Sequence, residues 1–110
     1  MDFNAVLLIT TVPVDGAEAV LKALGETGAG EIGWYTHCAF TNPGIGRFRP
    51  DARSNPAVGE REVINRVEEV RIETVCQRDR VKAALAALRA AHPYEEPAIY
   101  ILPVLNEEDF

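Results

Sequence analysis

Residues 3–12 read FNAVLLITTV, and nearly every position in this run is apolar. The run is too short and too rich in β-branched residues to favour a helix, and Pro13 ends it. An apolar run of this length predicts a central strand that is covered on both faces. The rest of the fold follows from what the sequence places after this strand.

Two amphipathic helices are predicted from apolar residues that recur at helical spacing. Asp15 and Glu18 form an acidic variant of a capping box at the start of the first helix. The second begins at Asp79 and ends at His92-Pro93, because proline cannot continue the hydrogen-bond ladder. The two apolar stripes are Ala17, Val20, Leu21 and Leu24, and then Val81, Ala84, Leu85, Leu88 and Ala91.

The remaining strands are indicated by alternating apolar residues and by turn residues. In the long run 63–76, Val70 and Ile72 face one way, whereas Glu69 and Arg71 face the other. The expected segments are a strand at 31–41, a tight turn at 42–44, a short returning strand at 45–49, an exposed loop at 51–61, and strands at 63–76 and 97–104.

This order predicts an α+β fold, the ferredoxin-like βαββαβ sandwich, formed by residues 1–110 as a single domain. Both helices cover one face of an antiparallel sheet, and an extra β-hairpin or loop lies at about 41–62. The first and last strands are apolar on both faces, so the other sheet face also needs cover. A homo-oligomer that packs sheet against sheet supplies it. The alternative is that the 41–62 segment folds back over the sheet.

The stretch GAGEIG at Gly28–Gly33 matches the glycine fingerprint of dinucleotide-binding proteins. In those proteins the glycines follow a strand and open a helix, whose N-terminus meets the phosphates. Here they follow a helix and precede a strand, which excludes the nucleotide interpretation. We expect them to provide a left-handed cap and close packing where the chain reverses.

Composition narrows the class of protein. The chain has 17 acidic and 11 basic residues, a formal charge of −6 and a pI near 4.9, which argues against a nucleic-acid partner. No apolar run approaches the length of a membrane span. The two cysteines, Cys38 and Cys76, indicate a reducing compartment rather than a disulfide scaffold. We therefore expect a soluble cytoplasmic protein that contacts neither nucleic acid nor membrane.

The segment AHPYEEPAIY, residues 91–100, gathers the ionisable side chains that could form a site. In a purely structural role, His92 bonds the last helical carbonyls, the prolines stiffen a turn and Tyr94 covers core. In a functional role, His92, Glu95 and Glu96 bind a divalent metal, zinc or copper, or a small anion. The spacing fits no closed zinc signature.

The segment WYTHCAF, residues 34–40, places His37 beside Cys38. On a regular strand these two side chains point to opposite faces and cannot hold one ion together. Cys38, beside Trp34 and Phe40, is predicted to be a buried thiol. A Cys–His nucleophilic pair through His92 is conceivable, but the sequence shows no oxyanion site, and we do not expect an enzyme.

Three blocks, residues 28–50, 66–75 and 91–104, together resemble the YqfO-type domain. That domain is best known as an insert in the Nif-three-like dinuclear metal hydrolases and here would stand alone. The segment HPYEEP before a final strand also resembles CutA proteins of the PII-like superfamily. Glu62 and Asn65 depart from the family pattern, which has a glycine and a glutamate at these positions.

The resemblance implies a CutA/PII-like trimer with its sheets facing the centre and clefts between subunits. The resemblance does not imply the hydrolase activity, because in that family the two metals are held by lobes that flank the insert. The function expected is a non-catalytic regulatory module that binds a small ligand or a protein partner, and the alternative is a CutA-like metal-ion binder. The implied ligand contacts are Tyr35, His37 and Tyr94, and the implied metal ligands are His92, Glu95 and Glu96, with His37 joining from a neighbouring strand or subunit. A small hydrolase or isomerase that uses the same histidines is the third alternative.

Overall fold

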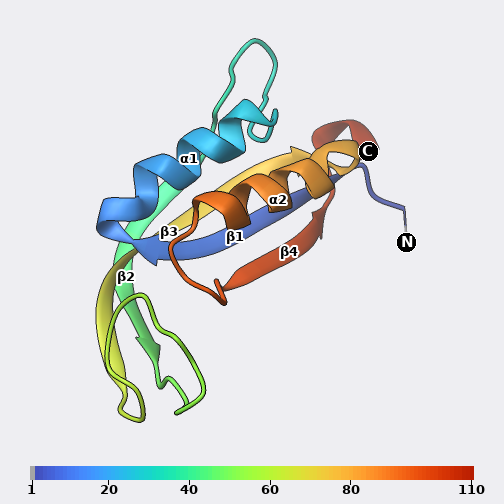
Figure 1. The fold of residues 1–110 in the computed structure, drawn as a ribbon. Coiled ribbons are helices and arrows are strands. Elements are labelled where there is room, and N and C mark those ends of the chain that lie inside the picture. The colour runs from blue at the N-terminus through green and yellow to red at the C-terminus, as the bar shows by residue number, and fades with distance from the viewer. Residues whose placement is uncertain (1) are drawn as a thin grey trace.

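The computed structural model describes residues 2–110 and contains one antiparallel sheet with two helices on one of its faces (Figure 1). The strand order is β2-β3-β1-β4, so the first strand is central, as predicted. The α+β fold expected from the sequence is therefore confirmed. The elements are β1 (Ala5–Pro13), α1 (Ala17–Glu26), β2 (Phe40–Phe48), β3 (Asn65–Gln77), α2 (Val81–Ala91) and β4 (Ile99–Val104), with 3-10 turns at Val14–Gly16, Arg78–Arg80 and Glu107–Asp109.

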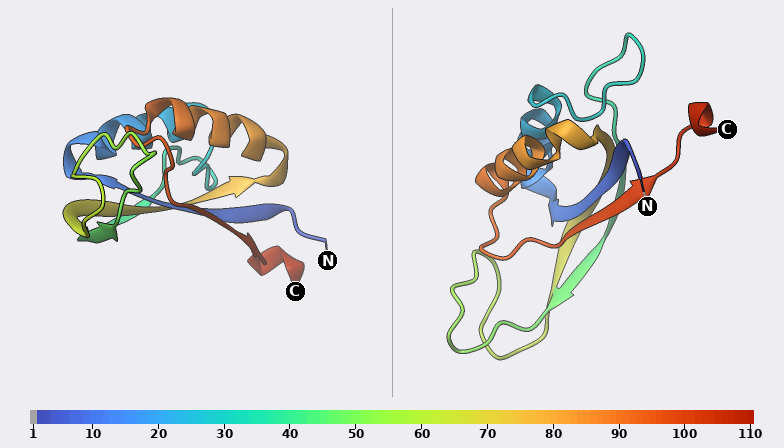
Figure 2. Two further views of the ribbon diagram at one scale, coloured as in Figure 1. Left: turned by 60° about the horizontal axis from the view of Figure 1, so that its bottom comes forward. Right: turned by 90° about the vertical axis from the view of Figure 1, so that its right-hand side faces the viewer.

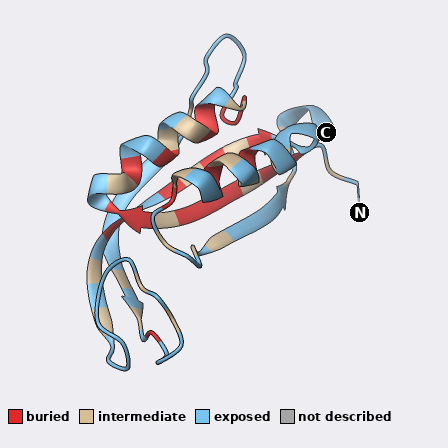
Figure 3. Ribbon diagram, viewed as in Figure 1, coloured by how far each residue is buried: buried red, intermediate tan, exposed pale blue. Residues whose placement is uncertain are grey.

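The core lies between the helices and the face of the sheet beneath them (Figure 2). Leu8 and Val12 on β1 and Ile72 on β3 contribute fully buried side chains to it. Figure 3 shows the buried residues running along β1 and along the inner sides of both helices. The helical stripes predicted from the sequence are confirmed, because Ala17, Val20, Leu24, Ala84 and Leu88 are all buried.

The predicted strand at 31–41 and turn at 42–44 are wrong. Strand β2 begins only at Phe40, and Pro43 lies within it, opposite Val70 of β3. Since β2 is an edge strand, it pairs on one side only, and a proline without an N–H group is tolerated there. Residues 27–39 instead form an irregular connection with one isolated bridge between Ile32 and Tyr35.

Local backbone geometry confirms a prediction about this connection and overturns a prediction about the start of α1. Gly28, Gly30 and Gly33 all have positive φ angles, of 95°, 83° and 58°, as expected for glycines that cap a helix and reverse the chain. The capping box predicted from Asp15 and Glu18 is absent. A 3-10 turn precedes α1, and no side chain caps the helix.

The sheet face opposite the helices carries exposed apolar side chains. Phe40, Tyr100 and Leu102 are 66%, 61% and 49% exposed, and the partners of Tyr100 and Leu102 on β1 are also apolar. The segment between β2 and β3 lies at the far end of the β2–β3 hairpin and leaves these side chains uncovered (Figure 2). Within residues 2–110, neither helix is long and apolar enough to cross a bilayer.

Candidate functional site

A cavity of about 440 Å³ lies where the β2–β3 hairpin meets the connection from α2 to β4. Four parts of the chain form its walls: Thr11 of β1, the end of β2 with the loop that follows it, Glu69 of β3, and the residues around HPYEEP. This size falls within the range typical of small-molecule sites. The side chains and backbone that matter most below are those of Thr11, Gly46, Phe48, Glu69, Tyr94 and Glu95.

Glu69 is a buried acid in the wall of this cavity. Its side chain leaves β3 on the face opposite Val70, as the alternation predicts, and the residue is only 5% exposed. The Tyr94 hydroxyl donates a hydrogen bond of 2.7 Å to Glu69 Oε2. Burial and the negative Glu69 carboxylate raise the pKa of Tyr94 well above its usual value. Tyr94 is therefore a neutral hydrogen-bond donor at physiological pH.

The second carboxylate oxygen of Glu69 packs above Gly46 of β2. A side-chain carbon on Gly46 would contact the carboxylate directly, so the glycine makes room for the acid. Among residues 2–110 no group donates a hydrogen bond to Glu69 Oε1, and no cation forms an ion pair with Glu69. Glu69 lines the cavity, so its carboxylate is available to a group that binds there.

The cavity lining is acidic overall. Its charged members give four carboxylates against two guanidinium groups, a formal charge of −2, and are Arg47, Arg49, Asp51, Glu69, Glu95 and Glu96. Two of the carboxylates are engaged at the rim. Asp51 bonds Arg53, which lowers the pKa of the Asp51 carboxyl, and Glu95 Oε1 accepts a 2.8 Å hydrogen bond from the backbone N–H of Asn55.

His92 has a structural role within the chain. Its Nε2 lies 2.8 Å from the carbonyl oxygen of Thr11, just past the last β1–β4 pair, and its Nδ1 lies 3.1 Å from the backbone nitrogen of Tyr94. A carbonyl only accepts and a backbone N–H only donates, so Nε2 carries the proton and the imidazole is neutral. Both ring nitrogens are occupied, and the residue is 6% exposed.

The predicted metal ligands do not converge in the single chain. Among residues 2–110, no three histidine, cysteine or acidic side chains lie close enough together to hold a metal ion. His92 uses both nitrogens elsewhere, and Glu95 bonds the loop after β2. The assignment of His92, Glu95 and Glu96 as metal ligands gains no support from this geometry and stays a prediction.

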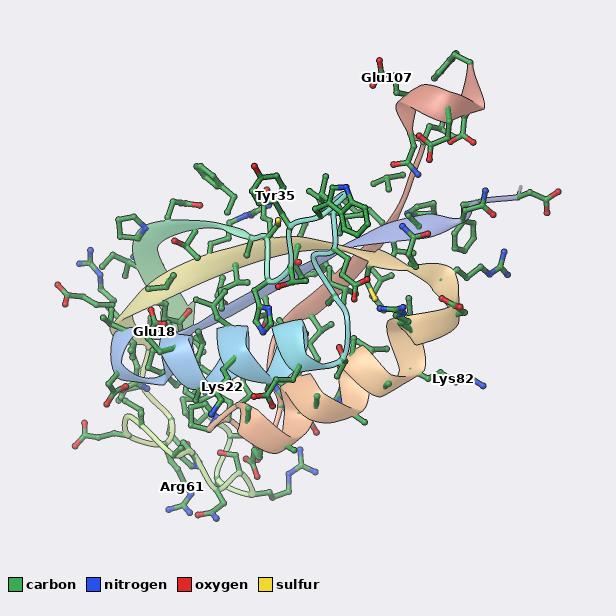
Figure 4. The ribbon with its side chains drawn as sticks, turned by 90° about the horizontal axis from the view of Figure 1, so that it is seen from above. Glu18, Lys22, Tyr35, Arg61, Lys82 and Glu107 are labelled. Atoms are coloured by element: carbon green, nitrogen blue, oxygen red, sulfur yellow. The ribbon has the colours of Figure 1, made fainter. Side chains whose placement is uncertain are left out.

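Tyr35 and His37 lie apart from Tyr94. Neither residue lines the cavity, and the connection that carries them extends from the opposite end of the sheet (Figure 1). Tyr35 is 75% exposed and lies on the side of the sheet away from the helices that carry Lys22 and Lys82 (Figure 4). The side chain of His37 packs over Gly25 at the end of α1.

Cys38 differs from its predicted environment. It is half-buried rather than buried, because Trp34 and Phe40, its expected cover, are both exposed. The side-chain directions predicted for this segment assumed a regular strand, and residues 34–39 do not form one. Cys76 on β3 is buried, and burial raises the pKa of its thiol.

Sequence reasoning missed Glu69 as a site residue, although it placed the side chain on the correct strand face. Its importance comes from Gly46, which lies on the neighbouring strand, and from Tyr94, 25 residues away along the chain. The sequence did contain a signal for Glu69. This acid lies on a predicted strand between the apolar residues Val67 and Val70, and Gly46 lies on the predicted strand before it. That signal becomes specific only once the β2–β3 register is known.

Comparison with known proteins identifies the relatives of this chain. No protein-family model matches it. The GTP cyclohydrolase 1 type 2 homolog of Bacillus subtilis is 46% identical over 97 residues, which are 88% of this chain and 26% of that protein. A Bacillus cereus protein related to NIF3 superposes with a TM-score of 0.81 at 41% identity, over 94% of this chain and 26% of that one. The chain is homologous to the inserted domain of NIF3-related proteins.

The chain spans about a quarter of the length of the relatives that it matches. Its fold also matches CutA1 of Shewanella sp. SIB1, with a TM-score of 0.72 over 96% of this chain and 86% of that protein. At 21% identity this second likeness shows the fold alone. The CutA/PII-like fold and the YqfO-type resemblance expected from the sequence are thus confirmed.

Proposed function

We propose that this NIF3-related domain is a non-catalytic, homo-oligomeric module that binds a small ligand in the cavity between the β2–β3 hairpin and the HPYEEP segment. The observation that carries the proposal is the cavity itself, whose wall holds a buried carboxylate with one oxygen that no described group bonds. The two free cysteines of the chain support a cytoplasmic location.

The exposed apolar face of the sheet supports the oligomer. Phe40, Tyr100 and Leu102 lie on that face and have no cover within residues 2–110. Apolar side chains of this size on neighbouring strands favour burial against a second copy. The trimer that the CutA resemblance implies would bury them at its centre.

The second candidate is a divalent metal-ion binder that uses Glu95, Glu96 and His92. The acidic lining favours a cation in the cavity. For His92 to bind a metal, however, one of its ring nitrogens must first release Thr11 or Tyr94, which costs one part-buried hydrogen bond. If metal uptake survives the change His92→Ala, this candidate is wrong.

Native mass spectrometry of protein purified without a chelator or an affinity tag tests both candidates. We expect a trimer without stoichiometric metal. The change Leu102→Glu should give a monomer, whereas Val14→Glu, at an exposed apolar residue in the turn before α1, should leave the assembly intact. A wild-type monomer would overturn the oligomeric module, and a trimer with one metal per chain would favour the second candidate.

A further inference from the structure

The charge at the base of the cavity indicates the class of ligand. We infer that the cavity binds an organic cation that bears N–H donors, such as an amidinium, guanidinium or primary ammonium group, with Glu69 as its counter-charge. This inference rests on the proposed function, which assigns the cavity as a ligand site. Three steps lead to it: the state of the Glu69 carboxylate, the sign of the surrounding charge, and the shape and polarity of the walls.

Oε1 of the Glu69 carboxylate has no hydrogen-bond donor among residues 2–110, although this oxygen is not fully shielded from solvent. A carboxylate with 5% exposure loses most of its hydration, and burial of a charge is costly unless hydrogen bonds or an opposite charge compensate. The Tyr94 hydroxyl supplies one neutral hydrogen bond to Oε2. Oε1 can only accept hydrogen bonds while the group is ionised, so the group that completes this site is a donor.

The surrounding charges favour a cation over an anion. The lining carries a formal charge of −2, and among residues 2–110 neither of its two arginines forms an ion pair with Glu69. Arg49 lies 3.9 Å from Glu62. Arg47 alternates with Gly46 and Phe48 along β2, so its side chain leaves the strand on the face opposite Glu69. An anion would meet the buried carboxylate without a compensating arginine beside it.

The walls favour an organic cation over a bare metal ion. The ring of Phe48 lies 5.9 Å from that of Tyr94, and Pro56, Val58 and Ala98 add apolar surface. Aromatic faces next to a carboxylate suit a flat cation with an apolar body. Divalent ions instead require several oxygen or nitrogen ligands, and residues 2–110 offer no such group of three.

An N–H cation could reach Glu69 from two sources. One is a free small molecule in solution, and the other is an arginine or lysine side chain of a second copy of this chain. Both would bond Oε1 in the same way, so the structure assigns the chemistry and the experiment separates the sources.

The experiment compares three probes of nearly the same shape: benzamidine, which is cationic, benzamide, which is neutral, and benzoate, which is anionic. Binding to the wild-type oligomer is measured by isothermal titration at pH 7.5. We expect saturable benzamidine binding that is at least 10-fold tighter than benzamide binding, and no benzoate binding. This comparison needs no variant and so does not depend on the folding of a mutant.

Two variants then assign the effect to the carboxylate. Glu69→Gln keeps the shape and removes the charge, and benzamidine affinity should fall at least 10-fold. Glu18→Gln makes the same change at an exposed acid of α1 outside the cavity lining, so benzamidine affinity should be retained. Thermal unfolding of both variants checks that they are folded. Equal benzamidine affinity in wild type and Glu69→Gln overturns the inference.

The other outcomes distinguish this inference from the proposed function. If benzoate binds and benzamidine does not, the charge assignment is wrong and the cavity remains a ligand site. If no probe binds to an intact oligomer that Glu69→Gln leaves unchanged, both the inference and the ligand site are wrong. If benzamidine or Glu69→Gln dissociates the oligomer, the inference holds and the cation is a side chain of a second copy.

Discussion

The two connections that lead from a helix into a strand use the same residue types in different ways. Residues 27–39 join α1 to β2, residues 92–98 join α2 to β4, and each carries a histidine and a tyrosine separated by one intervening residue. In the first connection both rings are exposed, whereas in the second the histidine is buried and the tyrosine half-buried. The pairs are Tyr35 with His37 and His92 with Tyr94.

The difference lies in what holds each connection in place. The first is fixed through its backbone. The Gly30 N–H donates to the carbonyl of Val75, the Cys38 N–H donates to the carbonyl of Gly30, and the Thr74 hydroxyl donates to the carbonyl of Cys38, at 2.7, 2.9 and 2.8 Å. The second is fixed through its side chains, by the bonds of His92 and Tyr94. Residue type alone therefore does not show which ring is free to meet a ligand or partner.

The largest effect is expected from a change at the backbone anchor of the first connection. Gly30→Ala combines a φ of 83° with a side-chain carbon 2.7 Å from the Cys38 nitrogen. We expect a loss of about 3–5 kcal/mol in unfolding free energy, from left-handed strain and a backbone clash. Urea unfolding monitored by circular dichroism measures it.

Gly33→Ala is the matched control within the same connection. Its φ is 58°, but nothing lies within 4 Å of the added carbon. Only the strain remains, so we expect a loss of about 1 kcal/mol. Equal losses at the two glycines would mean that the contacts of Gly30 with Cys38 and β3 do not hold the first connection.

A smaller effect is expected when the two histidines are compared. His92→Ala removes a buried ring that bonds Thr11 and Tyr94, and leaves the Thr11 carbonyl without its partner. We expect a loss of about 2–3 kcal/mol. His37→Ala removes an exposed ring whose hydrogen-bond contact is to Thr36, so about 0.5 kcal/mol or less is expected. Similar losses in the two variants would contradict the distinction between the connections.

The fold was predictable from the sequence where periodicity is strong. The central strand and both helical stripes follow from long apolar patterns, which tertiary contacts only reinforce. The start of β2 was not predictable, because Asn42, Pro43 and Gly44 are strong turn residues by local preference. Pairing with β3 overrides that preference at a sheet edge, and only the register of the strands reveals it.

The candidate site was predictable only in part, for a related reason. The HPYEEP segment was identified as a place where ionisable groups gather, and Tyr94 and Glu95 do line the cavity. Glu69 was not identified, because its burial depends on contacts that are distant in the sequence. One departure from the family pattern also has a physical meaning. Glu62 stands at a glycine position, and its φ of 67° is the left-handed conformation that glycine adopts most easily.

The smallest effect on unfolding free energy is expected when the two tyrosines are compared, and this effect depends on pH. Tyr94→Phe removes the hydrogen bond to Glu69 and should cost about 1–2 kcal/mol at pH 8, whereas Tyr35→Phe at the exposed tyrosine should cost nothing measurable. Because the folded-state pKa of Tyr94 is raised above 10.0, its contribution is complete below about pH 10. Above that pH the unfolded chain loses the proton while the folded chain retains it, so stability falls as pH rises.

Urea unfolding at pH 8, 10 and 11 measures this pH dependence. Since Tyr94 is only half-buried, screening by solvent should limit the loss to about 0.5–1 kcal/mol per pH unit above pH 10. The decline should persist in Tyr35→Phe and become shallower in Tyr94→Phe, because only the second variant lacks the raised pKa. If the decline is the same in both, Tyr94 is not held neutral against Glu69, and the wall of the cavity does not depend on that pair. If the decline becomes shallower only in Tyr94→Phe, the second connection uses the Tyr94 ring to hold the buried Glu69 carboxylate. The Tyr35 ring of the first connection then has no comparable role and is free to meet a ligand or partner.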